Sequence, residues 1–556
     1  MTRPCAAQFL ALCTAASMAA GAPPELTAIA PYAAAPGAAI EVKLSGKLEA
    51  AGVRIWCDDP AIVFSPPDKS GKTTLTIANH AAPGLHLLRI LSEEGVSAPL
   101  RFAIGTLPLL AEKEPNDALA QPQPVPSLPA WIHGQLDKAG DIDGFAIPLH
   151  KGVPVSIKAD AYALGSTVDL HLQILDPRGV KLATASDGPN LDPALVFTPE
   201  SDGLHIVQIA GFAHPPAADV GFTGSKQAYL LAITEGPAVT RIFPAAIPPT
   251  GPLPIELHGV GLKENKAEIT AAQLRGNGER ATLALPNAPF PIDVVRAAFP
   301  VLVAPQSSTE APFKITPPIV LAGRLEKPGT TAAFQIAMKK GAKLRARFWS
   351  RSIGLGVEGN LAILNAEGTR LAANENPSDI FTEPTLTWTA PADGDYKLTV
   401  ADLFSRGGPD AEYVLEIAEP PPTLDLQLSD GKPARIEAGK TIVLKAKAVF
   451  ANGFKEPLVL RVSGLPEGVW APEVAVPEKG GDIDITLHAA TNAPPATARI
   501  WVAAWTKATP PVFTGSAYSL RADTQRGHSQ SDRADDLWLN TVPAGTPPVP
   551  EKKKGK

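Results

Sequence analysis

The sequence has little of what several protein classes require. Three cysteines and three methionines occur in 556 residues, and aromatic residues make up 6% of the chain. With so few cysteines the chain is not a small domain held together by disulfides. No run of 18 apolar residues follows the N-terminal segment, which excludes a helical membrane transporter and predicts no membrane span. A net charge of −6 argues against a nucleic-acid partner, because proteins that bind nucleic acid usually have a strongly basic face.

Proline and glycine, in contrast, are abundant. The chain holds 59 prolines and 46 glycines, a density that long helices do not tolerate because each interior proline costs about 3 kcal/mol. Short strands joined by tight turns tolerate it well. Hydrophobic residues account for 45% of the chain, which is enough to build cores, and the length corresponds to roughly three to five domains. The composition therefore predicts an all-β protein of several domains.

The N-terminus has the pattern of an export signal. Arg3 precedes an apolar stretch over 5–20, and small residues suited to cleavage occur over 17–22. We predict a signal peptide over 1–22, with a buried N-terminal helix as the alternative. The protein is then expected to be secreted, periplasmic or on the cell surface, and after cleavage Cys57 is its single cysteine, without an internal disulfide.

Two long stretches of the sequence repeat one another at an offset of 189 residues. The segment 134–136 (Gly-Gln-Leu) recurs as 323–325 (Gly-Arg-Leu), and the segment 172–179, which ends in a Pro-Arg-Gly turn, recurs as 361–368. Apolar and polar residues alternate with period two in the segment 169–174, which is typical of a half-buried strand. Short strands with such turns indicate a β-sandwich, present in two copies.

A second repeat, at an offset of 213 residues, relates the segments 26–31 and 239–244. Each is followed by a turn and an alternating strand, which indicates a small immunoglobulin-type sandwich, and a fifth unit follows the prolines at 420–422. We therefore predict tandem β-sandwich domains in an extended string and a monomeric protein. The predicted divisions after the signal peptide are immunoglobulin-like sandwiches at 23–107, 237–316 and 421–543, copies of the repeated sandwich at 108–236 and 317–420, and a disordered basic tail at 544–556.

Five features of the first copy resemble one known family. They are the segments 112–117 (Glu-Lys-Glu-Pro-Asn-Asp) and 140–145 (Gly-Asp-Ile-Asp-Gly-Phe), Gly134, the turn at 176–179 and Asp202-Gly203. The unit resembles the bacterial pre-peptidase C-terminal (PPC) domain, a β-sandwich related to the collagen-binding domains of clostridial collagenases. The resemblance covers about 110–235 well and 318–420 more loosely, as a degenerate copy. The flanking units resemble bacterial immunoglobulin-like or IPT/TIG-like domains, and the layout resembles secreted proteins of planctomycete-type bacteria.

Acidic residues gather in this first copy, at Glu112, Glu114, Asn116, Asp117, Asp141 and Asp143. Residues two apart in an extended segment point to the same side, so paired carboxylates brought together would repel one another unless a cation neutralised them. Calcium takes oxygen ligands. In the collagen-binding relatives calcium lies at this junction, so the resemblance implies a Ca²⁺ site formed by these six residues, with solvated linker carboxylates as the alternative. Thr330 and Ala332 replace the last two in the second copy, where we expect no metal.

Motifs of common enzymes are missing from the sequence. It contains no H-E-x-x-H and no G-x-S-x-G segment. The segment 70–73 (Ser-Gly-Lys-Thr) resembles the end of a phosphate-binding loop, but position 66 is proline where that motif requires glycine. Cys57 has no nearby histidine to activate it, and we interpret it as a small buried hydrophobic residue. We therefore predict that the protein is not an enzyme.

Tryptophans occur in or beside the predicted strands, at 131, 349, 388, 501, 505 and 538. We interpret most of them as core residues; Trp349, between Arg347 and Arg351, is the candidate for a ring that stacks on a sugar or peptide. The sequence predicts a non-catalytic binding or adhesion protein that engages extracellular polysaccharide or protein at the cell surface. The alternatives are an accessory or targeting subunit of a secreted peptidase or other hydrolase, an enzyme with an unrecognised site, and a set of spacer domains.

Overall fold

The computed structural model of the chain describes residues 22–48, 52–105, 107–138, 140–166, 168–186, 192–211, 227–276, 278–288, 291–374, 383–429, 431–523, 530–534 and 537–547. These residues form 48 β-strands and two single-turn 3₁₀ segments, η1 (Ala271–Gln273) and η2 (Arg351–Ile353), with no α-helix among them. The predicted class, tandem β-sandwich domains, is confirmed. No helical segment in this part of the chain is long and apolar enough to span a membrane. The predicted signal peptide, apart from Ala22, and the tail beyond 547 lie outside the described residues.

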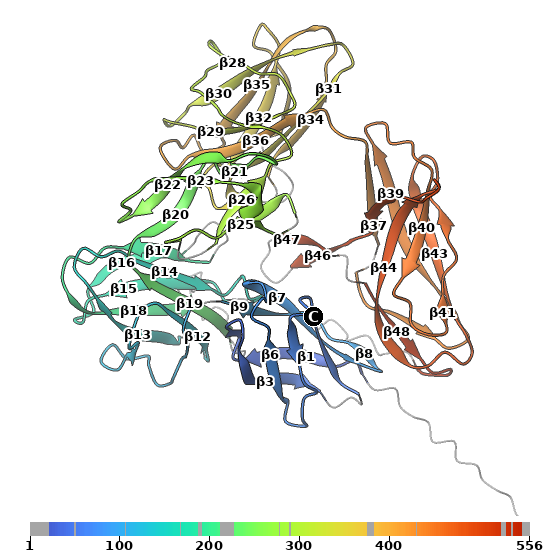
Figure 1. Cartoon of the computed structure of the whole chain (residues 1–556), viewed down its shortest axis with the longest axis horizontal. Helices are drawn as coiled ribbons and strands as arrows, with labels where there is room; N and C mark the ends of the chain where they lie inside the picture. The colour runs from blue at the N-terminus through green and yellow to red at the C-terminus, as the bar shows by residue number, and fades with distance from the viewer. Residues whose placement is uncertain are drawn as a thin grey trace, which may run out of the picture.

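Five domains follow one another along the chain (Figure 1), and the first and third have closely similar strand orders. Their sheets have the orders β1-β3-β6-β5 and β2-β9-β7-β4, with β8 beside β7, and β20-β22-β23 and β21-β26-β25-β24. The first domain contains β1 (Glu25–Ala30), β2 (Ala33–Ala34), β3 (Ala39–Lys47), β4 (Arg54–Cys57), β5 (Ile62–Phe64), β6 (Lys72–Ile77), β7 (Gly84–Ser92), β8 (Gly95–Val96) and β9 (Leu100–Ile104). The third contains β20 (Ala238–Phe243), β21 (Ala246–Ile247), β22 (Leu253–Val260), β23 (Lys266–Ile269), β24 (Leu274–Arg275), β25 (Arg280–Leu283) and β26 (Ile292–Arg296).

The second and fourth domains have identical strand orders, as the 189-residue repeat predicts. The second has sheets β10-β12-β19-β14-β17 and β11-β13-β18-β15-β16, and the fourth has β27-β29-β36-β31-β34 and β28-β30-β35-β32-β33. Strands of the second are β10 (Leu109–Ala111), β11 (Gln123–Pro124), β12 (Ala130–Leu136), β13 (Ile142–Leu149), β14 (Val155–Asp160), β15 (Leu170–Leu175), β16 (Lys181–Ala185), β17 (Ala194–Phe197), β18 (Gly203–Gly211) and β19 (Gln227–Glu235). Strands of the fourth are β27 (Val301–Val303), β28 (Phe313–Lys314), β29 (Ile319–Arg324), β30 (Thr331–Met338), β31 (Lys343–Trp349), β32 (Gly359–Leu364), β33 (Arg370–Asn374), β34 (Thr385–Thr389), β35 (Gly394–Asp402) and β36 (Glu412–Ala418).

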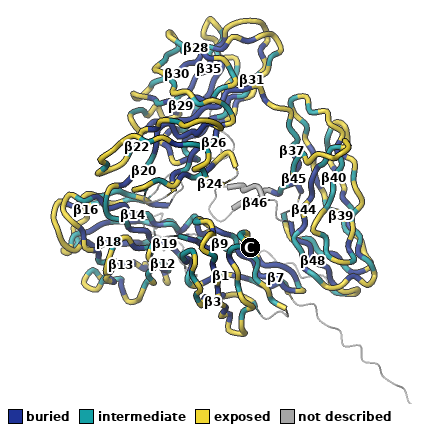
Figure 2. Tube along the Cα trace, viewed as in Figure 1, coloured by how far each residue is buried: buried dark blue, intermediate teal, exposed yellow. Residues whose placement is uncertain are grey.

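The fifth domain has the sheets β37-β39-β43-β41 and β38-β48-β44-β40-β42, with β45 added beside β44 and a separate hairpin of β46 and β47. Its strands are β37 (Thr423–Leu428), β38 (Ala434–Glu437), β39 (Thr441–Ala451), β40 (Leu458–Ser463), β41 (Val469–Trp470), β42 (Val474–Ala475), β43 (Gly481–Ala489), β44 (Ala496–Thr506), β45 (Phe513–Ser516), β46 (Ser519–Asp523), β47 (Gln530–Ala534) and β48 (Leu537–Val542). Buried residues are concentrated on the strands, where they alternate with more exposed ones, and the outer loops are largely exposed (Figure 2). Alternate strand residues fill one core per sandwich, as period-two patterning requires.

A glycine opposite a buried tyrosine recurs in the two copies of the repeat. Gly134 on β12 pairs with Tyr229 on β19, and Gly323 on β29 pairs with Tyr413 on β36. A Cβ atom added to either glycine would lie 2.3 Å from the nearest tyrosine ring or hydroxyl atom. Only glycine leaves room for the tyrosine ring over the sheet, which explains why this pair marks both copies.

We therefore expect Gly134→Ala and Gly323→Ala to destabilise their own domains by about 1–3 kcal/mol, the usual cost of overpacking a core. Thermal unfolding of the full chain measures the loss. Gly394→Ala is the matched control, because a Cβ atom added to Gly394 on β35 would meet nothing within 4 Å. Unchanged melting in both tyrosine-facing variants would contradict this explanation of the repeat.

The domains do not form the predicted extended string, because the fifth packs against the first (Figure 1). Trp538 of β48 lies edge-on to Trp56 of β4, with ring centroids 5.5 Å apart. Thr497 Oγ1 donates a hydrogen bond to the Ser92 carbonyl oxygen at 2.6 Å, and Asn540 Nδ2 donates one to the Glu93 carbonyl oxygen at 2.8 Å. These contacts join strands more than 400 residues apart in sequence and close the chain into a ring.

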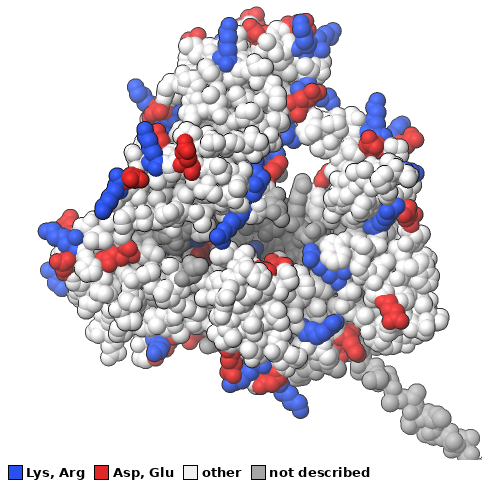
Figure 3. All heavy atoms as spheres, in the orientation of Figure 1, with Lys and Arg blue, Asp and Glu red and all other residues white. Residues whose placement is uncertain are grey.

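Other interfaces connect neighbouring domains along this ring. The first and second domains share an apolar cluster that includes Ala103 and Leu230, with Trp131 packed against it. Between the third and fourth, the buried carboxylate of Glu412 accepts hydrogen bonds from Arg324 at 2.7 Å and Arg241 at 3.3 Å. Positive and negative side chains are interspersed over the face drawn in Figure 3, without a large patch of one sign.

Candidate functional site

The predicted calcium ligands come from two neighbouring loops of the second domain. Glu112 to Asp117 belong to the segment between β10 and β11, and Asp141 lies just before Asp143 on β13. The Gly144 N–H donates to the Asn116 carbonyl oxygen at 3.3 Å, which ties the two loops together. As a result one carboxylate oxygen from each of four residues lies within 4.8 Å of the others; the four are Glu114, Asp117, Asp141 and Asp143.

Four oxygen atoms from these two segments are buried and accept no hydrogen bond from the described residues: the Oδ1 atoms of Asn116, Asp117, Asp141 and Asp143. Asn116, Asp141 and Asp143 are each at most 2% exposed. Buried polar atoms normally have a partner, since an unsatisfied one costs about 1–3 kcal/mol. These atoms are oxygens, the ligand type that Ca²⁺ prefers. The donor set therefore fits a calcium ion.

Glu112 has a different place from the other five predicted ligands. Its Oε1 accepts a hydrogen bond from Asn116 Nδ2 at 3.1 Å, and its Oε2 accepts one from the Gln135 N–H at 3.3 Å. Holding the Asn116 amide by its nitrogen leaves Asn116 Oδ1 without a hydrogen-bond donor in the part of the chain that the structure describes. Glu112 thus orients a candidate ligand and is not itself a member of the cluster of four carboxylates.

Negative charge accumulates at this centre. Burial raises the pKa of Asp143 to about 8, helped by the carboxylates of Glu112 and Asp141 and opposed by a hydrogen bond from the Tyr229 hydroxyl. Burial also raises the pKa of Glu112 to about 7, and neighbouring carboxylates add to the shift. Both shifts mean that the centre disfavours its own charge when no cation is bound.

Two residues at the centre were not singled out by the sequence. Lys138 Nζ lies 3.1 Å from Asp117 Oδ2 and 3.6 Å from Asp141 Oδ1, although its side chain is largely exposed. Tyr229 donates its hydroxyl hydrogen to Asp143 Oδ2. The 189-residue repeat contains a signal for the tyrosine, because Tyr413 occupies the equivalent position; no sequence pattern marks Lys138.

The fourth domain lacks the acidic centre at the equivalent place. Thr330 and Ala332 stand where the second domain has Asp141 and Asp143, and the segment 304–312 contains one carboxylate, Glu310. That carboxylate accepts hydrogen bonds from the side chains of Ser308 and Thr309. The two copies can therefore be compared directly. Both have the same strand order, but four buried oxygen atoms without a hydrogen bond from the described residues gather at this place in the second domain alone.

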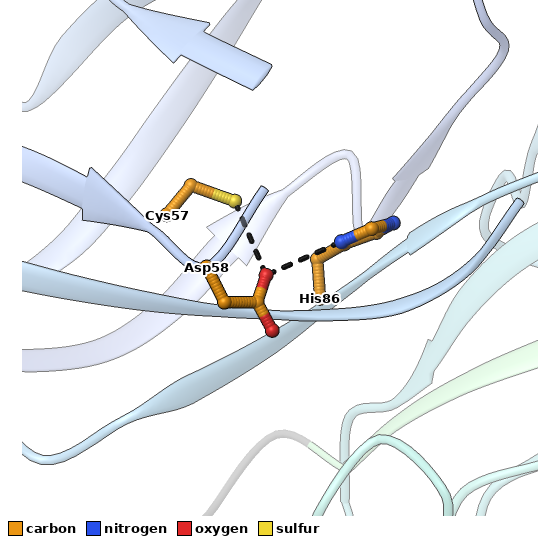
Figure 4. Close-up of side chains that lie close together, drawn as sticks. All are labelled: Cys57, Asp58 and His86. Atoms are coloured by element: carbon orange, nitrogen blue, oxygen red, sulfur yellow. Dashed lines mark hydrogen bonds and ion pairs between the residues drawn. The ribbon is translucent and has the colours of Figure 1, made fainter. Parts of the chain in front are cut away.

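Contrary to the sequence-based expectation, a histidine does lie near Cys57. Cys57 Sγ is 3.6 Å from Asp58 Oδ1, and the same oxygen is 3.2 Å from His86 Nδ1 (Figure 4). Cys57 is half-buried and not fully buried as predicted. The expectation was wrong because β7 pairs with β4 and carries His86 to the end of that strand. Burial, together with the Asp58 and Asp59 carboxylates, raises the pKa of the Cys57 thiol to about 12, so this thiol is not an activated nucleophile.

A row of aromatic and arginine side chains follows the outer face of β44 in the fifth domain. The Arg499 guanidinium lies 5.4 Å from the Trp56 ring centroid and 5.1 Å from that of Trp501. Farther along, the Arg461 guanidinium lies 5.6 Å from the Trp505 centroid. The exposed end of the row is Phe513, which meets Trp505 edge-on. By contrast Trp349, the predicted stacking residue, is buried between the third and fourth domains, 6% exposed.

A cavity of about 280 Å³ lies between the second and third domains. It is lined mainly by apolar residues, with Ser156 and Thr240 as its hydroxyl-bearing side chains among the described residues. No titratable side chain belongs to this lining. The cavity therefore does not bring together a nucleophile with a base.

No family model and no curated protein matches the chain. Among solved structures, it is similar to the glycan-binding protein SGBP-B of the Bacteroides ovatus mixed-linkage glucan utilization locus, at 8% identity over 72% of this chain and 76% of that one, with a TM-score of 0.14. It is also similar to the four N-terminal Ig domains of Dscam1, at 9% identity over 94% and 98% of the two chains, with a TM-score of 0.17. These similarities identify neither a function nor a ligand, and the resemblance to the PPC family stays a prediction.

Proposed function

We propose that this chain is an exported, non-catalytic binding protein that engages an extracellular polysaccharide through its fifth domain, while Ca²⁺ holds the loops of its second domain. The observation that carries the proposal is the aromatic–arginine row on β44. Trp501 and Phe513 are 36% and 53% exposed, whereas sandwich aromatics usually lie in the core.

The chemistry of the row suits a sugar chain. Aromatic rings carry negative charge on their faces, which attracts the weakly positive C–H groups on the face of a pyranose. A guanidinium group beside an aromatic ring can donate hydrogen bonds to sugar hydroxyl groups through N–H groups that its ion pair does not use; Arg461, beside Trp505, is ion-paired with Glu473 through its Nε atom at 2.7 Å. Trp501 and Trp505 are four residues apart on one strand face, about 13 Å at a rise of about 3.3 Å per residue. An extended oligosaccharide can contact both.

The calcium part of the proposal rests on the orphaned oxygens of the second domain. The Oδ1 atoms of Asn116, Asp117, Asp141 and Asp143 would be ligands, and Glu114 offers a further carboxylate from the more exposed side. A bound divalent cation would neutralise the buried charge and fix the segment before β11 against β13. Glu112 would not contact the ion but would orient the Asn116 amide, from whose nitrogen it accepts a hydrogen bond.

A polysaccharide array tests the binding function directly. The full chain is expected to bind at least one glycan class, and Phe513→Ala and Trp501→Ala are each expected to weaken that binding by roughly tenfold, because an aromatic contact contributes about 0.5–1.5 kcal/mol beyond its area. Trp470→Ala is the matched control, since Trp470 is exposed on the opposite sheet of the same domain. If Trp470→Ala lowers the affinity for the glycan as much as the other two changes do, or if none of the three changes lowers it, the ligand does not bind at this row.

The same array tests the absence of catalysis. Recovered glycans are expected to keep their chain length after prolonged incubation with the protein. Shortened products that disappear on a single substitution would show an enzyme and refute the non-catalytic part of the proposal.

A further inference from the structure

We propose that Cys57, Asp58 and His86 form a second metal site, for a borderline transition-metal cation of the Zn²⁺ class. It lies in the first domain, whereas the acidic centre lies in the second, and the two share no residue. Cys57 is the last residue of β4, Asp58 follows it, and His86 lies on the adjacent antiparallel strand β7 (Figure 4).

The spacing of the three donor atoms suits tetrahedral coordination. In a tetrahedral zinc site with Zn–S of about 2.3 Å and Zn–N or Zn–O of about 2.0–2.1 Å, neighbouring ligand atoms are roughly 3.3–3.5 Å apart. Cys57 Sγ lies 3.6 Å from Asp58 Oδ1, and His86 Nδ1 lies 3.2 Å from the same oxygen. One donor atom from each residue lies within 4.8 Å of the other two. Small side-chain rotations would complete the geometry.

The hydrogen bonding of His86 aims its Nδ1 atom at this position. His86 Nε2 lies 2.8 Å from the Ala82 carbonyl oxygen, and since a carbonyl oxygen only accepts, Nε2 must carry the hydrogen. Nδ1 then faces the Asp58 carboxylate at 3.2 Å. Two lone pairs that face each other repel unless a cation, either a proton or a metal ion, lies between them. A histidine whose second nitrogen donates to a carbonyl group is the usual arrangement of a metal ligand.

The surrounding loop holds these donors in place. The Asp58 N–H donates to the Leu87 carbonyl oxygen at 3.1 Å. Asp59 Oδ1 accepts from the Ala61 N–H at 2.8 Å, and its Oδ2 accepts from the Ala82 N–H at 3.4 Å. His86 is 8% exposed, while about a third of the Asp58 side chain is exposed. Solvent can therefore supply a fourth ligand on the Asp58 side.

The donor types select the class of ion. The ion would displace the Cys57 thiol hydrogen, which leaves as a proton to solvent. The resulting thiolate and an imidazole favour Zn²⁺, Co²⁺ or Cu ions over Ca²⁺ and Mg²⁺, which prefer oxygen ligands alone. The two proposed centres are thus expected to have opposite preferences, with Ca²⁺ at the second domain and Zn²⁺ at the first. Each can be tested without loading the other.

Cobalt spectroscopy on the full chain tests this site. Co²⁺ is expected to give a thiolate-to-cobalt charge-transfer band and the visible bands of tetrahedral cobalt, saturating at one equivalent and bleached by Zn²⁺. The thiolate band should vanish in Cys57→Ser, although Cys5 and Cys13 remain, and the visible bands should weaken in His86→Gln. Asp143→Asn, in the acidic centre, is the matched control and should leave the spectrum unchanged.

Thermal unfolding shows whether each variant still folds. Zn²⁺ is expected to raise the melting temperature of the wild-type chain and not that of Cys57→Ser, whose melting without metal should stay close to that of the wild type. A cobalt spectrum without a thiolate band, or one that persists in Cys57→Ser, would overturn the proposal. So would a Zn²⁺ shift of equal size in the two proteins.

Discussion

Adding Ca²⁺ to the metal-free full chain is expected to raise the melting temperature of the second domain by roughly 10 °C. A ligand at about 100 times its dissociation constant adds about 2.7 kcal/mol to the free energy of unfolding, and for a domain of this size each kcal/mol shifts melting by a few degrees. The physical source is the neutralisation of carboxylates whose buried Oδ1 atoms accept no hydrogen bond from the described residues and have Lys138, 3.6 Å from Asp141, as a largely exposed cation beside them. Differential scanning calorimetry with calcium and with a chelator measures the shift.

Substitutions separate a calcium effect from general ionic stabilisation. The double change Asp141→Asn and Asp143→Asn should abolish the shift, because it removes two of the carboxylates that converge at the centre. Glu310→Gln, in the corresponding segment of the fourth domain, should leave the shift intact. Since burial raises the pKa of Asp143 to about 8, the double variant should be at least as stable as the wild type in chelator. If millimolar calcium leaves the melting temperature of the second domain unchanged, the proposed calcium site is contradicted.

Trp538→Ala is expected to open the ring of domains. Trp538 is 3% exposed and packs between the first and fifth domains, where it contacts Trp56 and Leu91. Truncating a buried tryptophan costs about 3–5 kcal/mol, which is comparable with the whole stability of a modest interface. The segment 419–422 then links the fifth domain to the rest, so the radius of gyration from small-angle X-ray scattering should increase.

The control for this experiment is again Trp470→Ala. It removes a tryptophan of the same domain from the sheet that faces away from the first domain, and the radius of gyration should not change. If Trp538→Ala keeps the wild-type scattering curve while the domains stay folded, the contact does not hold the ring closed.

Much of the fold could be predicted because the information is local. Period-two alternation and proline–glycine turns depend on residues close in sequence. The internal repeats show that such local patterns occur twice, and the 189-residue repeat reappears as identical strand orders in the second and fourth domains. The bulge that β1 forms against β3 recurs where β20 pairs with β22. In both, a glycine passes close to a backbone carbonyl group: Gly46 beside Glu25 and Gly259 beside Ala238.

The arrangement of the domains could not be predicted in this way. Trp538, Thr497 and Asn540 belong to regular strands, and nothing in their local pattern distinguishes an outward-facing interface residue from a core residue. Their partners lie more than 400 residues away. The extended string was therefore the natural expectation from sequence, and the ring follows from contacts that local patterns do not encode.

The candidate site was predicted in part for the same reason. Two acidic pairs in neighbouring loops were visible in the sequence, and the structure brings Glu114, Asp117, Asp141 and Asp143 together. The separate role of Glu112 depends on the direction of one amide group. The proximity of Cys57 and His86 depends on the register between β4 and β7. Neither can be read from spacing along the chain.

A crystal structure of the full chain grown with calcium would show directly whether the second domain binds this ion. We expect an ion with an anomalous signal at the acidic centre, about 2.3–2.6 Å from its oxygen ligands as is usual for calcium, with Asn116 Oδ1 and the Oδ1 atoms of Asp117, Asp141 and Asp143 among them. The fourth domain should show none. A Lys138 ammonium group at that position, neutralising the carboxylates in place of a metal, would contradict it.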